Sequence, residues 1–197
     1  MTSSGVGLKL WQRKWRWYNR DRAPWRRIEL HRRLAASGAF ARMPLQGEPL
    51  ELLREGRLIV GPGVLFEPLV WLTGGATGRI SIGEGSILNI GVLIAALNEV
   101  TIGSHTMVAN GCVITDADHR FDDLSKPVTM QGFKSKGPTK VGDNCWLGAN
   151  VVVTSGVTIG ERSVIGANSV VTSDIPAFSV AVGAPARVVA THESQAL

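Results

Sequence analysis

Residues 141–171 read VGDNCW LGANVV VTSGVT IGERSV IGANSV V, with an aliphatic residue at the start of every block of six. A period of six is neither the 3.6 of an α-helix nor the plain alternation of a β-strand. It is typical of a solenoid whose coils repeat a short strand and a tight turn, with one bulky side chain pointing inward. Small residues usually follow the aliphatic one, and glycine, asparagine or aspartate lets the chain turn. The pattern predicts an all-β fold built around a continuous aliphatic column.

The same period extends toward the N-terminus with two changes of phase. It runs from residue 58 to 94, slips by two before Ile102, and slips by three across a long interruption that begins after Ile114. All the predicted inward positions except Ala76 are Val, Ile or Leu, and we expect five to six coils between residues 58 and 176. The predicted inward residues are Leu58, Val64, Val70, Ala76, Ile82, Leu88, Ile94, Ile102, Val108, Ile114, Val141, Leu147, Val153, Ile159, Ile165 and Val171.

Composition excludes several classes of protein. The chain has 197 residues, 44% hydrophobic and 19% charged, which is too apolar for a disordered chain. Two cysteines, Cys112 and Cys145, are too few for a disulfide scaffold, and their place in the hexapeptides predicts buried thiols. No apolar run reaches the roughly 18 residues of a membrane span, and residues 11–33 are too rich in arginine for a secretory signal. We therefore expect a cytoplasmic protein.

The net charge of +5 is concentrated near the N-terminus. Residues 9–33 hold ten basic and two acidic side chains, a net +8, and the remaining 11 basic and 14 acidic residues give −3. Four of the six tryptophans lie in the same stretch. Pairs of apolar residues four apart favour helix, and Pro24 predicts the start of a helix over residues 25–36, with Gly38 just past its end.

This stretch divides the chain into parts. The prediction is a basic, Trp-rich helical arm over residues 1–45, a repeat domain over 46–190 with a loop at 115–140, and a tail at 191–197. A basic helix with tryptophans can lie on an anionic membrane surface, gather an anionic substrate or bind nucleic acid. It can also simply pack on the domain with its arginines in water. We expect no nucleic acid among the ligands. We expect the protein to lie peripherally at the inner membrane face.

One histidine lies where the repeat is interrupted. His119 follows Thr115-Asp-Ala-Asp, and a long Lys-, Gly- and Pro-containing stretch then leads to Lys140. A loop of about 20 residues within a regular solenoid is uncommon unless it has a function. Histidine is the side chain best suited to accept a proton near neutral pH. The loop therefore favours an enzyme over a non-catalytic scaffold or binding platform, which remains the alternative.

The hexapeptides and the interruption together carry a family resemblance. Ile114-Thr-Asp-Ala-Asp-His119, the loop, and Val141-Gly-Asp-Asn-Cys-Trp-Leu-Gly148 resemble the galactoside, maltose and nodulation-sugar O-acetyltransferase branch of the bacterial transferase hexapeptide family. The resemblance implies a left-handed parallel β-helix and a homotrimer with sites between subunits. It also implies acetyl-CoA as donor, a sugar or glycan hydroxyl as acceptor, and His119 as the general base.

Further residues take roles from the same resemblance. Their repeat positions also allow several of them to be no more than small turn residues. The matching acceptor-binding residues are Asn89, Asp116 and Asp118. Those along the CoA path are Trp146, Ala149, Ala167, Thr172, Ser173 and Arg187, and no metal is implied.

One departure concerns the acceptor. Where sugar-acetylating relatives carry acidic residues after the strand that contains Asn89, this chain has Ala95-Ala96-Leu97. An amphipathic or lipid-linked acceptor, or an amine, therefore stays open beside a sugar hydroxyl. A zinc-dependent carbonic anhydrase with the same coil needs three histidine ligands, and His105 and His119 lack a third at suitable spacing.

Overall fold

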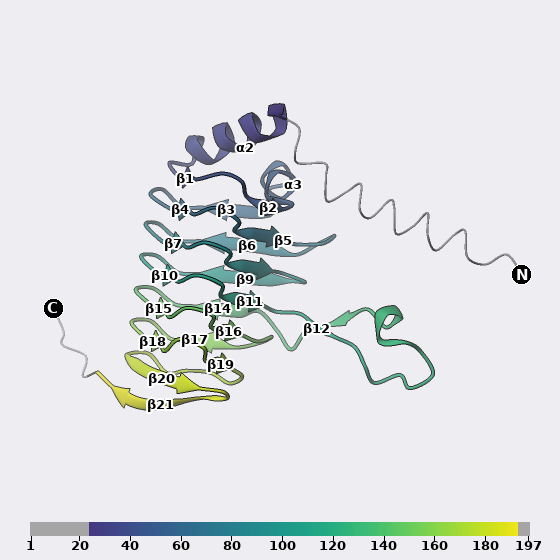
Figure 1. The fold of residues 1–197 in the computed structure, drawn as a ribbon, viewed down its shortest axis with the longest axis vertical. Coiled ribbons are helices and arrows are strands. Elements are labelled where there is room, and N and C mark those ends of the chain that lie inside the picture. The colour runs from purple at the N-terminus through teal and green to yellow at the C-terminus, as the bar shows by residue number, and fades with distance from the viewer. Residues whose placement is uncertain (1–23, 193–197) are drawn as a thin grey trace, which may run out of the picture.

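The computed structural model describes residues 24–192, and it shows a three-sided parallel β-helix capped by a helix (Figure 1). Each coil visits the three sheets in the order A, B, C. We call the turns between them the A–B, B–C and C–A corners. No helix within residues 24–192 has the length and apolar character needed to cross a membrane.

Short strands form the three sheets, one strand per sheet in each coil. Sheet A contains β1 (Phe40–Ala41), β4 (Leu65–Phe66), β7 (Ile87–Leu88), β10 (Met107–Val108), β15 (Trp146–Leu147), β18 (Val164–Ile165), β20 (Ser179–Gly183) and β21 (Ala186–Thr191). Sheet B contains β2 (Gln46–Gly47), β5 (Trp71–Thr73), β8 (Leu93–Ala95), β11 (Val113–Thr115), β16 (Val152–Val153) and β19 (Val170–Val171). Sheet C contains β3 (Leu58–Val60), β6 (Arg79–Ile82), β9 (Glu99–Ile102), β14 (Thr139–Val141) and β17 (Thr158–Ile159).

The predicted aliphatic column fills the interior, with a correction in its first turn. All the predicted positions are buried except Ala76, which is exposed in the B–C corner between β5 and β6. The strand register pairs Phe66 with Leu88 and Leu72 with Ile94. The main column therefore contains Phe66 and Leu72, and the predicted phase over residues 58–76 was wrong by two residues. The error was hidden because residues two apart on a strand share a face, so both face inward.

The small residues after the aliphatic ones at the C–A corner serve close packing rather than turning. A Cβ on Gly103 would lie 2.5 Å from the carbonyl carbon of Gly142 and 2.6 Å from the amide of Asp143 in the next coil. The left-handed conformation falls two residues later, for example at His105 (φ 53°) and Asn144 (φ 54°). Glycine at this corner lets successive coils stack at strand spacing.

Helix α2 (Pro24–Ala36) closes the N-terminal end of the solenoid (Figure 1). The predicted helix and its end are confirmed, since Gly38 follows it with φ +77°. Leu30 and Leu34 are buried on one face, and Arg26 is buried in an ion pair with Glu51 of the short helix α3 (Pro49–Arg54). The described part of the predicted arm is therefore packed on the first coil. The first half of that arm, with Trp11, Trp15 and Trp17, lies outside the described residues.

The boundary predicted between residues 45 and 46 does not coincide with the start of the solenoid. Strand β1 already pairs in parallel with β4, so the first coil begins at Phe40. At the other end, β21 folds back antiparallel on β20 and reaches Thr191. The antiparallel strand covers the last parallel edge of sheet A, which would otherwise be open to another chain.

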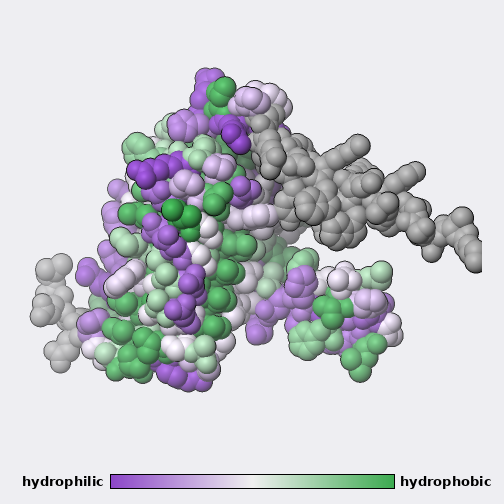
Figure 2. Space-filling view, in the orientation of Figure 1, coloured by the Kyte–Doolittle hydropathy of each residue, from purple (hydrophilic) through white to green (hydrophobic). Residues whose placement is uncertain are grey.

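The predicted loop leaves the solenoid at the B–C corner after β11. Residues 116–138, which we call the His119 loop, form a hairpin of β12 (Asp118–His119) and β13 (Phe133–Lys134) with the 3₁₀ turn η2 (Val128–Met130) beyond it. Figure 2 shows the loop as a lobe that stands out from the solenoid, with polar and apolar side chains mixed on it.

Candidate active site

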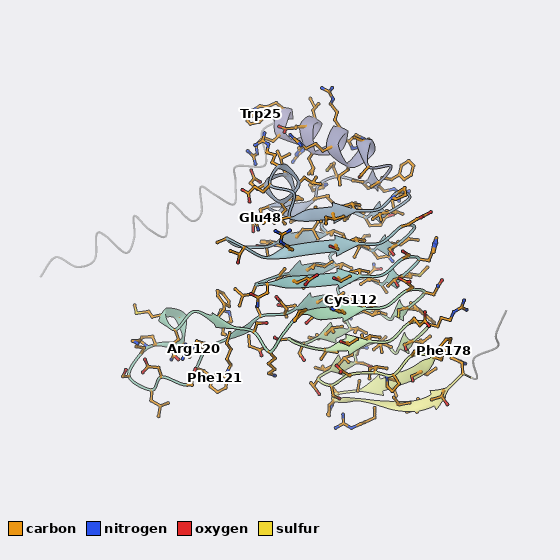
Figure 3. All side chains as sticks on the ribbon, turned by 180° about the vertical axis from the view of Figure 1, so that it is seen from behind. Trp25, Glu48, Cys112, Arg120, Phe121 and Phe178 are labelled. Atoms are coloured by element: carbon orange, nitrogen blue, oxygen red, sulfur yellow. The ribbon has the colours of Figure 1, made fainter. Side chains whose placement is uncertain are left out.

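His119 lies on the hairpin of the projecting loop with its side chain exposed. Its ring packs against Phe133 on the paired strand, with the ring centroids 4.5 Å apart and the planes tilted by 39°. The neighbouring Arg120 pairs with Asp122 further out, and both Arg120 and Phe121 lie on the lobe that Figure 3 shows from behind. The ring is thus oriented by an aromatic contact and is open to a substrate.

Asp116 is turned away from any acceptor, in contrast to the acceptor contact that the sequence predicted. Its side chain is 0% exposed. Oδ1 accepts a hydrogen bond from the Leu97 amide (2.5 Å), and Oδ2 accepts from the amides of Asn98 and Glu99 (both 2.8 Å). Because both oxygens are occupied by the B–C corner of the previous coil, Asp116 anchors the chain where the loop begins.

Asp118 and Asn89 lie in different surroundings. The Asp118 carboxylate is partly exposed beside His119 and lies 3.6 Å from the ammonium of Lys136 on the returning arm of the loop. Asn89 lies at the A–B corner after β7, and its Nδ2 donates to the carbonyl of Val108 in the next coil (3.2 Å). Asp118 is therefore close to the predicted base in the same chain, and Asn89 belongs to another corner.

Trp146, Ala149 and Ala167 follow the A–B side of the solenoid. The Trp146 side chain points outward from sheet A and is exposed. Gly148 donates its amide to the carbonyl of Ile165 (2.8 Å) and Asn150 to that of Asn110 (2.9 Å). The amide of Ala149 between them has no hydrogen-bond partner among residues 24–192.

The same arrangement recurs one coil further on. The amides of Gly166 and Asn168 are bonded to Ala181 and Ala149, and within the described range the Ala167 amide has no partner. The A–B corner thus carries N–H donors that a carbonyl-bearing ligand can occupy. Because the feature repeats from coil to coil, it follows from coil geometry and is not special to one residue.

The remaining predicted CoA contacts lie elsewhere. Thr172 and Ser173 are exposed just after β19, at the B–C corner of the last coil. Arg187 is exposed on β21, where its guanidinium donates to the carbonyl of Ala186 (2.8 Å). All three residues lie toward the C-terminal end of the solenoid.

A single chain does not bring these residues into one pocket. His119 and Asp118 extend from the B–C corner, whereas Asn89, Ala149 and Ala167 lie at the A–B corner on the other side of sheet B. A strand of sheet B separates the two corners in every coil. The predicted residues can meet only if the loop of one subunit approaches the A–B corner of another.

Other catalytic chemistries find less support among residues 24–192. No group of three His, Cys, Asp or Glu side chains in that range is placed to hold a metal ion. Cys112 and Cys145 are buried, and each thiol donates to a backbone carbonyl at 3.1 Å, Gly148 and Gly160 respectively. Burial raises the pKa of both thiols, which disfavours the nucleophilic thiolate.

Two residues at the base of the loop escaped the sequence analysis. Thr139 and Ser155 are buried and hydrogen-bond to the backbone where the loop leaves the solenoid. Their partners are 24 and 39 residues away in the sequence, so local spacing gave no sign of them. The signal that could have found them is a hydroxyl two residues from an inward aliphatic position, Val141 for Thr139 and Val153 for Ser155.

Sequence comparisons place this geometry among known proteins. The profile of the family Bacterial transferase hexapeptide (six repeats) matches residues 138–173. The chain is 37% identical to galactoside O-acetyltransferase of Escherichia coli over 139 residues, covering 70% of this chain and 66% of the relative. It is 36% identical to nodulation protein L of Rhizobium meliloti, covering 69% and 72%. Against a probable acetyltransferase of Mycobacterium tuberculosis the identity is 34%, over 59% of this chain and 38% of the relative's length.

Solved structures share the fold. Galactoside acetyltransferase in complex with coenzyme A superposes with a TM-score of 0.61 at 34% identity, covering 73% of this chain and 70% of the other. A maltose O-acetyltransferase of Clostridium difficile 630 gives 0.56 at 32% identity, covering 75% and 76%. The left-handed parallel β-helix predicted from the hexapeptides is confirmed.

The fold and the histidine-bearing loop together define a transferase of the left-handed β-helix class. More narrowly, the chain belongs to the hexapeptide-repeat acetyltransferase family, in which galactoside O-acetyltransferase and nodulation protein L are similar members.

Proposed function

We propose that the protein transfers an acetyl group from acetyl-CoA to a hydroxyl of a sugar or glycan, with His119 as the general base. The observation that carries the proposal is the exposed His119 on the one described loop that interrupts the coils (Figure 1). The relative with bound coenzyme A and the sugar acetyltransferases among the similar proteins support the donor and the acceptor class.

The proposed reaction assigns one step to each group. The imidazole of His119 takes the proton of the acceptor hydroxyl while the oxygen attacks the thioester carbonyl. The amide of Ala149, which has no partner within the described chain, donates to the carbonyl oxygen as its negative charge grows. The imidazolium returns its proton to the departing thiolate. A general base of this kind contributes roughly 10²–10⁴ to the rate.

We also propose a homotrimer, because two of the three outer faces are apolar. The strand registers align the outward residues of each sheet into rows. Sheet A presents Phe40, Leu65, Ile87, Met107, Trp146, Val164 and Val180, and sheet B, after the polar Gln46 of its first coil, presents Trp71, Leu93, Val113, Val152 and Val170. Sheet C presents Ile59, Ser81, Thr101, Lys140 and Thr158.

Two different apolar faces suit a cyclic assembly. In a ring, face A of one subunit packs against face B of the next, and the interface repeats until the ring closes. In that packing the His119 loop, which leaves the far edge of face B, lies beside face A of the neighbouring subunit. The exposed apolar side chains of the His119 loop, including Phe121, Leu124 and Met130, would then be covered.

For the N-terminal region we propose an anionic membrane surface as partner, at the inner face of the membrane. On α2, the side chains of Trp25 (Figure 3) and Ile28 are 58% and 60% exposed, and the neighbouring Arg27 is exposed too. Tryptophan and arginine together favour the lipid interface. Sedimentation with anionic vesicles should fall for Trp25→Ala/Ile28→Ala and not for Ile59→Ala on sheet C. Equal sedimentation of both variants would contradict the proposal.

The acceptor class is tested by thiol release from acetyl-CoA across a panel of sugars, glycolipids and amines. The proposal predicts release with at least one hydroxyl acceptor and an O-acetyl product by mass spectrometry. Release with amines alone would replace the sugar by an amine acceptor. Absence of release with every member, in a folded protein that binds coenzyme A, would favour a non-catalytic binding protein.

A further inference from the structure

The start of the His119 loop is fixed by a buried carboxylate. Asp116 lies three residues before His119, and its carboxylate accepts three hydrogen bonds from consecutive backbone amides, residues 97–99, of the previous coil. Each of these amides belongs to the B–C corner, where the previous coil turns without a loop. The carboxylate therefore ties the point at which the chain departs to the regular part of the solenoid.

A hydroxyl joins the two arms of the loop at the same point. Ser155, 3% exposed in the next coil, donates to the carbonyl of Asp116 (2.7 Å) and accepts from the amide of Lys136 on the returning arm (2.9 Å). Thr139 donates to the carbonyl of Thr115 (3.0 Å) and accepts from the amide of Gly156 (3.1 Å). A Cβ on Gly156 would lie 2.9 Å from Cβ of Lys136, so glycine allows the returning arm to lie this close.

We propose that Asp116 and Ser155 are positioning residues, which clamp the base of the loop between the previous and the next coil and so set where His119 stands relative to the solenoid. The inference rests on the proposed function of His119. It assigns no contact with the substrate to either residue, since both are buried.

The need for such a clamp follows from the shape of the loop. Beyond the base, the β12–β13 hairpin stands out from the solenoid as a lobe (Figure 2). A small rotation at the base is therefore carried outward to the imidazole. A displacement of about 1 Å in a catalytic group can cost about 10²-fold in rate.

The chain contains a matched control for the clamp. Glu48 is also buried, and its Oε1 accepts from the Thr73 hydroxyl (2.9 Å) and from the amides of Gly74 and Gly75 (both 2.8 Å). These partners form the B–C corner of an earlier coil. Figure 3 places Glu48 on the same edge as the loop but nearer α2. Glu48 thus makes the same kind of bond to the same corner without supporting a catalytic loop.

The test compares Asp116→Asn and Ser155→Ala with Glu48→Gln in the full chain. Two readouts are measured: kcat and KM for acetyl-CoA, and amide hydrogen exchange of the hairpin, including Arg120, whose amide bonds to Gly132 (3.0 Å). We expect kcat to fall at least tenfold for the first two variants at a KM within about threefold of the wild type. Exchange in residues 117–121 and 133–136 should rise in parallel. Glu48→Gln should change neither kcat nor the exchange of the hairpin, even if it lowers the melting temperature as much as Asp116→Asn does.

Equal kcat and equal hairpin exchange in Asp116→Asn and Glu48→Gln would overturn the inference. If Asp116→Asn fails to fold, Ser155→Ala alone decides by the same two readouts. If the wild-type protein transfers acetyl to no acceptor, the exchange measurement still decides the clamp. Faster exchange would then support the clamp while the proposed function fails, and unchanged exchange would overturn the clamp as well.

Discussion

At the scale of single residues, the predicted base is held by a neighbour that does not titrate. Phe133 contacts the ring of His119 at 4.5 Å between centroids, and aromatic contacts of this kind contribute about 0.5–1.5 kcal/mol beyond burial. The charged groups of the lobe are paired among themselves. The guanidinium of Arg120 lowers the pKa of Asp122, and the ammonium of Lys126 lowers that of Asp123. The imidazole is left free to meet an acceptor hydroxyl.

The two thiols give a prediction at this scale. Burial raises the pKa of Cys112 and Cys145, so the reactive thiolate is scarce and also inaccessible. In a native sample at pH 8, a thiol-specific disulfide reagent should label neither cysteine, and in denaturant it should label both. Rapid labelling of the native protein would contradict the assignment of both residues to the core.

Residue roles were also the hardest part to predict. His119 could be singled out because it is a titratable residue in an interruption of a strict repeat. The role of Asp116 could not, because its partners lie 17 to 19 residues earlier and become neighbours only when coils stack. The family resemblance implied a substrate contact for Asp116, whereas the backbone amides of the previous coil bind its carboxylate.

At the scale of elements, the hexapeptide pattern predicted the strands better than the corners. Inward aliphatic positions from residue 82 onward were all correct, since one residue type at fixed spacing defines a column. The turn between β5 and β6 covers residues 74–78, longer than residues 96–98 between β8 and β9, and Ala76 was placed inward although it is exposed there. Corner length depends on backbone contacts between coils, which a period of hydrophobic residues does not encode.

Helix α2 gives a prediction about pH. Hydrogen bonds from Arg54 and Arg33 lower the pKa of Glu29 from 4.5 to about 2. Because the folded pKa is lowered, the stability from this pairing is present above about pH 4.5 and is lost as the pH falls toward 2. The melting temperature of Glu29→Gln should be lower than that of the wild type at pH 6, and the two should converge near pH 2. Glu84→Gln, at an exposed C–A corner, serves as control, and a constant difference down to pH 2 would contradict the prediction.

At the scale of the whole molecule, the proposed site draws on residues that the described chain holds at different corners. The chain's outward rows on sheets A and B are apolar, and the predicted acetyl-CoA contacts Ala149 and Ala167 lie at the A–B corner, whereas its own loop leaves from the B–C corner. The proposed ring of three subunits would cover the rows and place the loop of one subunit beside its neighbour. The described part of the basic stretch, in helix α2, lies at the N-terminal end of the solenoid.

The face of sheet A gives a prediction about assembly. Met107 is 45% exposed in the middle of the row. Met107→Glu should shift the protein from trimer to monomer in light scattering and should abolish acetyl transfer, because a charge would be buried at the interface. Thr101→Glu on sheet C should leave the mass unchanged. A trimer that survives Met107→Glu, or a wild-type monomer with full activity, would contradict the proposed assembly.

The most direct test of the account is the turnover of His119→Ala. With acetyl-CoA and an acceptor that the wild type uses, kcat should fall by about 10²–10⁴, while the mass of the assembly and the circular dichroism spectrum stay as in the wild type. Turnover within a few-fold of the wild type, in a protein that remains assembled, would contradict His119 as the base.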